Sequence, residues 1–272
     1  MSHEKRTAEF WLLAIFFALF VVFLYGPLSA ILILSFQGPG GGLTFPMNGV
    51  SLHWFRNLME QQAVGDFGAS FRRSLVLGLM VMVVTVVVSL LAGLAFRRKF
   101  KGATALFYLS VASLVVPSII ISLGIGVMFQ QIGIRPSWYG SAFGAHLTWT
   151  LPFGVLIMFA VFNRFSPAYE EAARDLGATS WQTFRHVVLP MIAPSLIGIG
   201  LFGFTLSYDE FARTLMTAGT YNTLPLEIYG MTTNVTTPVL YALGTVTTVF
   251  SFLVILAALG LIAHVGRRRQ RG

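Results

Sequence analysis

The chain has 272 residues, of which 56% are hydrophobic and only 10% are charged, and its mean hydropathy is +0.76. A water-soluble domain carries roughly 25% charged residues, so this composition excludes an ordinary soluble protein and indicates an integral membrane protein. The net charge of +8 does not indicate nucleic-acid binding, because the basic residues lie at the ends of apolar runs, and the absence of cysteine excludes disulfides.

Six apolar runs are long enough to cross a membrane, which takes about 20 residues. The first follows a charged start and is too long for the hydrophobic region of a signal peptide, so we expect it to remain as a transmembrane helix. The predicted spans are approximately 10–36, 74–96, 104–130, 143–163, 191–212 and 239–264. The expected fold class is all-α, with about six transmembrane helices in a single domain covering 1–272.

Lysine and arginine set the predicted orientation, because they are enriched in cytoplasmic loops. With the N-terminus inside, most of the 18 basic residues face the cytoplasm. The outside set consists only of Arg56, Arg72, Arg73, Arg135 and Arg213. This asymmetry predicts that both termini, and the loop at 166–190, are cytoplasmic.

Residues 37–73 form the external segment between the first two spans. The glycines within 38–42 predict a turn without regular structure. Residues 51–58 then have the pattern of a short amphipathic helix with Ser51 as its N-cap. We expect this helix to lie in the outer membrane interface with Trp54 as an aromatic anchor; a docking contact for another protein is the alternative.

The block at 166–190 is mostly polar and separates two apolar runs. Ser166 and Pro167 have the pattern of an N-cap followed by a first helical proline, and Glu170 and Glu171 fall in the first turns, where the positive helix end favours acids. Gly177 is placed to end this helix in a left-handed conformation. One face of the helix is small and apolar: Ala172, Ala173 and Leu176.

A second short helix is predicted directly after the glycine. Thr179 or Ser180 can cap it, Trp181 and Phe184 give it a side that looks buried, and Pro190 marks the entry into the fifth span. The block is therefore expected to be a helix–glycine–helix elbow, whose small-residue surface suits insertion into a groove of a partner. The alternative is an ordinary loop between two helices.

Two sequence blocks at a fixed spacing resemble a known family. Glu171-Ala172-Ala173, then Gly177 after three residues and Val187-x-Leu189-Pro190 after nine, resemble the EAA loop of ABC importer permeases, EAA-x3-G-x9-I-x-L-P. Only Val187 departs from it. The resemblance implies a type I ABC importer permease whose cytoplasmic loop fits a cleft of an ATPase subunit. It implies a coupling role for Glu170, Glu171, Ala172, Ala173, Gly177, Leu189 and Pro190.

Asp209 and Glu210 are two adjacent acids at the end of the fifth apolar run. Asp209 lies about 28 Å along a helix from Pro190, in the outer half of the bilayer or at its edge. A carboxylate at the centre of a membrane helix costs roughly 2.5–3.5 kcal/mol, so at least one of the pair is expected to face a cavity or a partner. Two roles stay open for Asp209: a pathway or gate residue, or an ion pair with Arg213.

The segment that follows resembles spermidine/putrescine permeases. Residues 223–229 with Thr237-Pro238 match a TLPLxIY…TP stretch, residues 207–210 match an acidic pair after a Ser-aromatic, and the similarity covers roughly 10–265. Arg73 departs from the pattern of these permeases, because many relatives carry Asn at this position. The resemblance implies a polyamine as the cargo. Carboxylates and aromatic faces along a path would suit such a polycation. The candidate pathway residues are Tyr208, Asp209, Glu210, Glu227, Tyr229 and Trp149.

Motifs for catalysis are absent from the sequence. A phosphate-binding P-loop needs G-x4-G-K-[ST], but the three lysines are followed by Arg, Phe and Gly. There is no H-E-x-x-H pair for zinc, and Ser141 near His146 lacks a nucleophile-elbow motif. We therefore expect no catalytic, cofactor-binding or metal-binding residue; a membrane-embedded enzyme or a receptor is a distant alternative.

The sequence thus predicts a permease subunit of an ATP-driven importer, forming half of a translocation pathway in the bacterial inner membrane. Polyamines are the expected cargo, and an opine, an amino-acid derivative, an iron chelate or a phosphonate is the alternative. The expected partners are a second homologous permease, two ABC ATPase subunits, a periplasmic or extracellular substrate-binding protein and membrane lipid, with no nucleic acid. The chain itself is expected to bind no cofactor, since the partner ATPase subunits use ATP and Mg.

Overall fold

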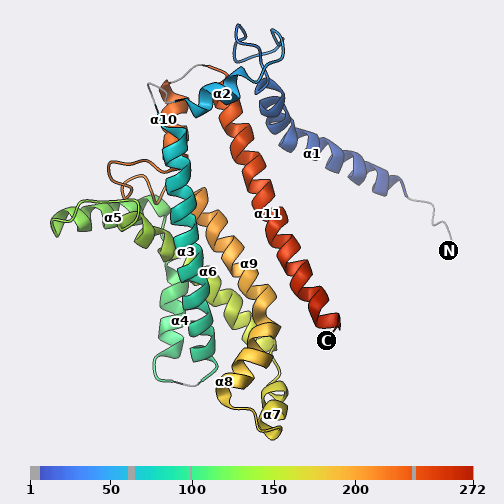
Figure 1. The fold of residues 1–272 in the computed structure, drawn as a ribbon, viewed down its shortest axis with the longest axis vertical. Helices are drawn as coiled ribbons and strands as arrows, with labels where there is room; N and C mark the ends of the chain where they lie inside the picture. The colour runs from blue at the N-terminus through green and yellow to red at the C-terminus, as the bar shows by residue number, and fades with distance from the viewer. Residues whose placement is uncertain (1–6, 61–64, 99, 235–236, 272) are drawn as a thin grey trace. The chain divides into compact units, whose positions relative to one another are not determined.

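The computed structural model describes residues 7–60, 65–98, 100–234 and 237–271, in which the regular structure is helical (Figure 1). The elements are α1 (Ala8–Leu34), α2 (His53–Met59), α3 (Phe67–Phe96), α4 (Ala103–Ala112), α5 (Ser118–Gln131), α6 (Ser141–Arg164), α7 (Ala168–Asp175), α8 (Ser180–Thr183), the π-helix η1 (Phe184–Val188), α9 (Leu189–Tyr208), α10 (Leu224–Asn234) and α11 (Val239–Arg271). The predicted all-α membrane fold is confirmed.

The chain divides into two compact units, residues 1–65 with 230–250 and residues 66–229 with 251–272. In the first unit the buried Gln37 side chain organises the glycine-rich turn, because its amide donates to the Gly42 carbonyl and accepts from the Asn48 N–H at 2.7 Å. Trp54 is buried, with 8% of its surface exposed. Because protein covers its side chain, the expectation that Trp54 is an aromatic anchor in the outer membrane interface is wrong.

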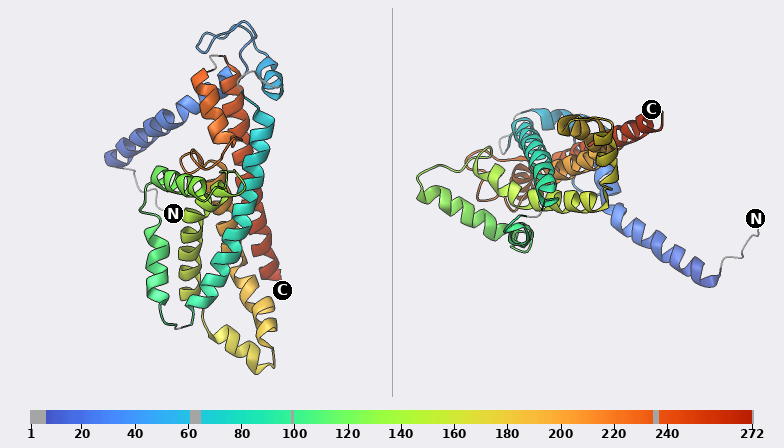
Figure 2. Two further views of the ribbon diagram at one scale, coloured as in Figure 1. Left: turned by 90° about the vertical axis from the view of Figure 1, so that its left-hand side faces the viewer. Right: turned by 90° about the horizontal axis from the view of Figure 1, so that it is seen from below.

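Three long helices, α3, α6 and α9, make the most extensive contacts within the second unit (Figure 2). Small residues let them approach closely: a Cβ on Gly154 would lie 2.0 Å from Ser89 Oγ, and one on Gly93 would lie 2.8 Å from Met158 Cβ. Membrane helices associate through such small-residue contacts, since lipid offers no hydrophobic driving force between them. These three helices form the rigid part of the fold that positions the site.

Five helices are long and apolar enough to cross a membrane: α1, α3, α6, the continuous helix from Ser180 to Tyr208, and Val239–His264 of α11. The third predicted span, 104–130, is not one helix. Helical bonding stops after Ala112, and α5 begins after Pro117, which lacks an N–H and disfavours helix at the residue before it. The 10 residues of α4 rise about 15 Å, half of the roughly 30 Å hydrocarbon thickness.

The two pieces of the broken span run in different directions. α4 runs back along the direction of α3 and contacts α6, whereas α5 runs across the direction of α3 (Figures 1 and 2). This bend brings the first turns of α5 to the end of α9, where Ser122 Oγ donates to the Arg213 carbonyl at 2.9 Å. The break in the predicted span therefore helps to build the polar site described below.

Two other predicted boundaries are also shifted. α3 begins at Phe67 instead of residue 74, because Asp66 caps it by accepting from the Ala69 N–H at 2.9 Å. At the end of the fifth span, α9 stops at Tyr208 instead of 212. Asp209 and Glu210 consequently lie in a non-helical segment, where helical i,i+4 spacing no longer decides which side chains meet.

Candidate functional site

The elbow in the polar block is built by local hydrogen bonds around Gly177. Gly177 has φ of 83°, which only glycine adopts without strain. Its N–H donates to the Arg174 carbonyl at 2.8 Å, and the Ala178 N–H donates to the Ala173 carbonyl at 3.0 Å. These two bonds form a Schellman motif that ends α7. The predicted left-handed helix stop at Gly177 is confirmed.

The second arm of the elbow is longer than predicted. Thr179 and Gln182 form a capping box, in which Thr179 Oγ1 accepts from the Gln182 N–H and Gln182 Oε1 accepts from the Thr179 N–H. The helix then continues through η1 into α9, and Pro190 is the second residue of α9. At the other end, Pro167 and not Ser166 is the N-cap of α7. The elbow thus leads from α7 directly into a membrane span.

The outer surface of the elbow is apolar and exposed in this chain. Leu176 is 90% exposed and Trp181 is 65% exposed, so the expectation of a buried Trp-x-x-Phe side is wrong for Trp181. Glu171, Ala172 and Pro190 are also exposed, and Ala173 and Leu189 are half-buried. Exposed apolar side chains on a polar loop are typical of a surface that a partner protein covers.

The two adjacent glutamates of α7 have different surroundings. Glu170 is 14% exposed and pairs with Arg97 at 2.6 Å and with Arg174 at 3.7 Å. Glu171 is exposed. Of the two glutamates, only Glu171 therefore presents its carboxylate to the surface of this chain, although the family resemblance implied a coupling role for both.

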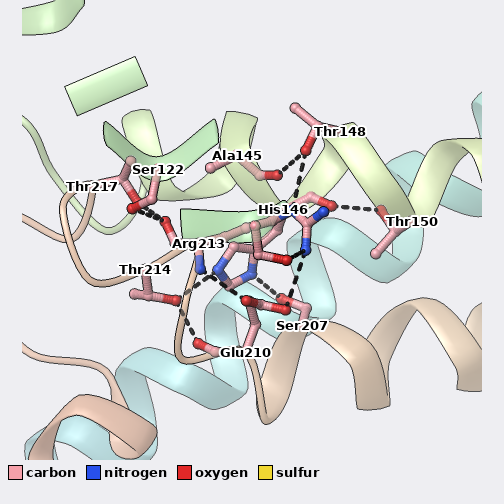
Figure 3. Close-up of polar contacts among 11 residues, drawn as sticks. Ser122, Ala145, His146, Thr148, Thr150, Ser207, Glu210, Arg213, Thr214 and Thr217 are labelled. Carbon is pink, nitrogen blue, oxygen red and sulfur yellow. Dashed lines mark hydrogen bonds and ion pairs between the residues drawn. The ribbon is translucent and has the colours of Figure 1, made fainter. Parts of the chain in front are cut away.

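A second polar cluster surrounds Arg213, whose side chain is only 2% exposed (Figure 3). Its guanidinium donates to Ser118 Oγ at 2.6 Å and to Thr148 Oγ1 at 3.3 Å. Nη1 lies 3.6 Å from Glu210 Oε2, and Cζ lies 4.4 Å from the centre of the Trp149 ring. Arg213 thereby joins α5, α6 and the segment after α9 through one buried cation.

His146 of α6 completes the cluster from the opposite side. It is fully buried, with Nδ1 2.8 Å from Ser207 Oγ and Nε2 2.9 Å from Thr214 Oγ1. Thr214 Oγ1 donates to the Glu210 carbonyl, so it accepts from Nε2–H, and Nδ1 accepts from the Ser207 hydroxyl. This arrangement satisfies both nitrogens of a neutral imidazole, and it fixes the end of α9 against α6.

The predicted pathway residues near Arg213 divide into two groups. Glu210 and Tyr208 are buried. Glu210 forms an ion pair with the Arg213 guanidinium, and its Oε1 also accepts from the Arg213 backbone N–H at 2.8 Å. Asp209 is exposed. Arg213 therefore pairs with Glu210, and the alternative in which it pairs with Asp209 is wrong.

Glu227 and Tyr229 lie on α10 and also differ from each other. Both carboxylate oxygens of Glu227 are bonded: Oε1 accepts from the Asp66 N–H at 2.7 Å and Oε2 accepts from Asn222 Nδ2 at 2.9 Å. Glu227 thus holds α10 at the N-terminus of α3. Tyr229 is exposed, and its ring lies 5.1 Å from that of Phe211.

Sequence reasoning did not find Ser118, Thr148, Ser122 or the role of His146. These residues come from α5 and α6, and no spacing within the sequence connects them to residue 213. A signal for the ion pair did exist, since Glu210 and Arg213 are three residues apart. Arg73, where the sequence departs from the resembled pattern, donates to the Asn222 carbonyl at 2.6 Å and so fixes the N-terminal part of α3.

Comparison with known proteins gives consistent matches. Residues 85–271 match the family described as binding-protein-dependent transport system inner membrane component. The chain is 27% identical over 238 residues to the spermidine/putrescine transport system permease protein PotC of Escherichia coli (strain K12), covering 87% of this chain and 88% of PotC. It is 26% identical over 251 residues to the putrescine transport system permease protein PotI of that strain, covering 89% and 85%. A solved bacterial ABC transporter that imports the acidic polysaccharide alginate has a subunit with TM-score 0.70 and 18% identity, covering 93% of this chain and 96% of that one.

Proposed function

Because this chain belongs to the family of binding-protein-dependent transport system inner membrane components, we propose that it forms half of a translocation pathway that imports polyamines. The chain is an inner-membrane, multi-pass permease of an ABC importer, and it is not an enzyme. ATP is hydrolysed by partner subunits.

Relatives that cover most of the chain carry the proposal of a polyamine cargo. PotC is a spermidine/putrescine permease and PotI is a putrescine permease, and each aligns over more than four fifths of this chain. The structural neighbour, by contrast, imports an acidic polysaccharide. The fold therefore accepts cargoes of opposite charge, and the choice has to come from side chains.

Asp209 is the side chain that best supports a cationic cargo. Its carboxylate is exposed at the end of a membrane span, whereas Glu210 is neutralised by Arg213. A carboxylate at such a depth is costly unless it faces water or a cation, so it is expected to line a cavity. The exposed Tyr229 ring adds an aromatic face suited to an ammonium group.

The partners follow from the same family. We assign a second homologous permease, two ABC ATPase subunits and a substrate-binding protein, with the α7 elbow inserted into an ATPase subunit on the cytoplasmic side. The basic residues support this orientation, because Arg97, Arg98 and Arg174 lie at the same end of the helix bundle as α7. ATP-driven closure of the ATPase subunits would move α7 and expose the pathway to the outside, and hydrolysis would return it.

Uptake of labelled spermidine and putrescine tests the cargo. The chain is expressed with its neighbouring transporter genes in cells that lack their own polyamine importers. We expect saturable, ATP-dependent uptake of the labelled polyamines. Unlabelled opines, amino acids and sugars are expected not to inhibit it. An assembled complex that hydrolyses ATP without importing either polyamine would rule out the cargo and leave the permease itself standing.

Asp209→Asn is expected to lower polyamine uptake about tenfold or more, since it removes a carboxylate–ammonium contact worth roughly 1.5–3 kcal/mol. Assembly with the partner subunits is expected to stay normal, because Asp209 is exposed in this chain. Asp209→Glu keeps the charge and serves as the matched control. Unaltered uptake kinetics in Asp209→Asn would remove Asp209 from the pathway.

A further inference from the structure

An ion pair joins the end of α3 to the first turns of α7. Arg97, the residue after α3, donates from Nη1 to Glu170 Oε1 at 2.6 Å. Both side chains are largely covered, with 25% of Arg97 and 14% of Glu170 exposed. Glu170 directly precedes the Glu171-Ala172-Ala173 block.

The guanidinium of Arg97 is also held by aromatic rings. Its Cζ lies 5.0 Å from the centre of the Phe162 ring and 5.4 Å from that of Phe165. Phe162 is near the end of α6, and Phe165 is in the connection to α7. Arg97 therefore has a fixed position before it meets Glu170, which lowers the entropic cost of the ion pair.

This ion pair is the main connection between α3 and α7. Among the described residues, α7 packs on α8 and η1, whereas the extensive helix contacts of α3 are with α6 and α9. A cavity of about 410 Å³ lies beside the pair and is lined by Gly93, Arg97, Phe162, Asn163, Phe165 and Pro167. Arg97 lines this space, so tight packing does not tie the end of α3 to α7 here, and the ion pair with Glu170 makes the connection.

The connectivity gives α7 three routes to the membrane helices. Two are covalent: residues 165–167 join α7 to α6, and Gly177 and η1 lead from α7 into α9. The third runs through Glu170 and Arg97 to α3, which packs along α6 and α9. Because neither covalent route leads to α3, the ion pair makes α3 follow a movement of α7.

We propose that Arg97 and Glu170 are positioning residues that couple movement of α7 to α3, so that α3 and α9 tilt together. The proposal rests on the proposed contact of α7 with an ATPase subunit. It assigns separate tasks to the adjacent glutamates: Glu171 faces the ATPase, and Glu170 transmits the movement inside this chain. Loss of the pair should uncouple hydrolysis from transport without preventing either partner from binding.

The test measures ATP hydrolysis and solute uptake by the same assembled complex, with its ATPase subunits and binding protein, in proteoliposomes. In Arg97→Gln and in Glu170→Gln, uptake per ATP hydrolysed is expected to fall about fivefold or more, the range of typical coupling between distant sites. Arg98→Gln is the matched control, because Arg98 is the neighbouring exposed arginine, and its ratio is expected to change less than about twofold. Arg174→Gln removes only the longer, exposed partner of Glu170 and is expected to behave like the control.

Rescue separates transmission from simple structural support. The chain has no cysteine, so Arg97→Cys with Glu170→Cys gives a single pair that a short bifunctional thiol reagent can join. Joining the pair is expected to restore the uptake-to-hydrolysis ratio, and a cleavable reagent allows the restoration to be reversed.

Two outcomes would overturn the proposal: an unchanged ratio in both single variants, or a parallel loss of hydrolysis and uptake that cross-linking does not repair. Failure of the α7–ATPase contact is recognised separately, because Glu171→Lys would then leave ATPase co-purification and uptake unchanged.

Discussion

Replacing Glu171 by lysine is expected to lower solute uptake about a hundredfold or more, because a like charge set against a partner surface costs several kcal/mol. The folded chain itself should tolerate the change. Glu171 is exposed, and as an acid near a helix N-terminus it contributes about 0.3–1 kcal/mol. The loss of uptake would therefore report on a contact outside this chain. Uptake, the amount of protein in the membrane and co-purification of the ATPase subunits are measured together.

Asp175→Lys is the matched control for this variant. It makes the same charge change on the same exposed helix, but in the last turn, where a cation is favourable. Uptake close to the wild-type level is expected. Normal uptake in Glu171→Lys, or an equal loss in both variants, would contradict the assignment of Glu171 to the ATPase contact.

Replacing Arg213 by methionine is expected to remove most of the folded protein from the membrane. The change leaves the Glu210 carboxylate buried without its counter-ion, and breaking a buried pair in this way costs about 3–5 kcal/mol. It also removes the donors to Ser118 and Thr148 that join α5 to α6. The measurement is the amount of intact protein in the membrane and the midpoint of thermal unfolding in detergent.

The double variant Arg213→Met with Glu210→Gln distinguishes a buried charge pair from a purely packing role. It removes both charges, and Gln can still accept from the residue-213 N–H that now donates to Glu210. Recovery of most of the lost stability is expected, since a buried pair contributes little net free energy once neither charge needs a partner. Arg72→Met, at an exposed position on α3, is the control and should be near wild type. A double variant as unstable as the single one would contradict this account.

Large parts of the fold and of the elbow were predictable from the sequence because their causes are local. A span needs a run of about 20 apolar residues, and five of the six predicted runs are membrane-length helices. The stop at Gly177 uses hydrogen bonds between residues at most five apart, and the cap at Thr179 uses bonds between residues three apart. Such interactions form in one short segment, so residue type and spacing are sufficient to identify them.

The incorrect predictions about individual carboxylates share a different cause. The sequence contains two adjacent glutamates in α7 and two adjacent acids after Tyr208, and within each pair the residues look equivalent. The position of Arg97 at the end of α3 turns Glu170 inward, and Arg213, held by Ser118 and Thr148, takes Glu210 instead of Asp209.

Glu227 shows the same effect over a greater distance in sequence. It looked like a pathway carboxylate, but it accepts from the N–H of Asp66, 161 residues away. The sequence by itself determined five of the membrane-length helices and where the elbow bends, because apolar runs and local hydrogen bonds decide both. Only the tertiary structure decided which of several like carboxylates is neutralised and which faces outward, because a buried charge takes whichever partner the packing of distant helices brings within reach.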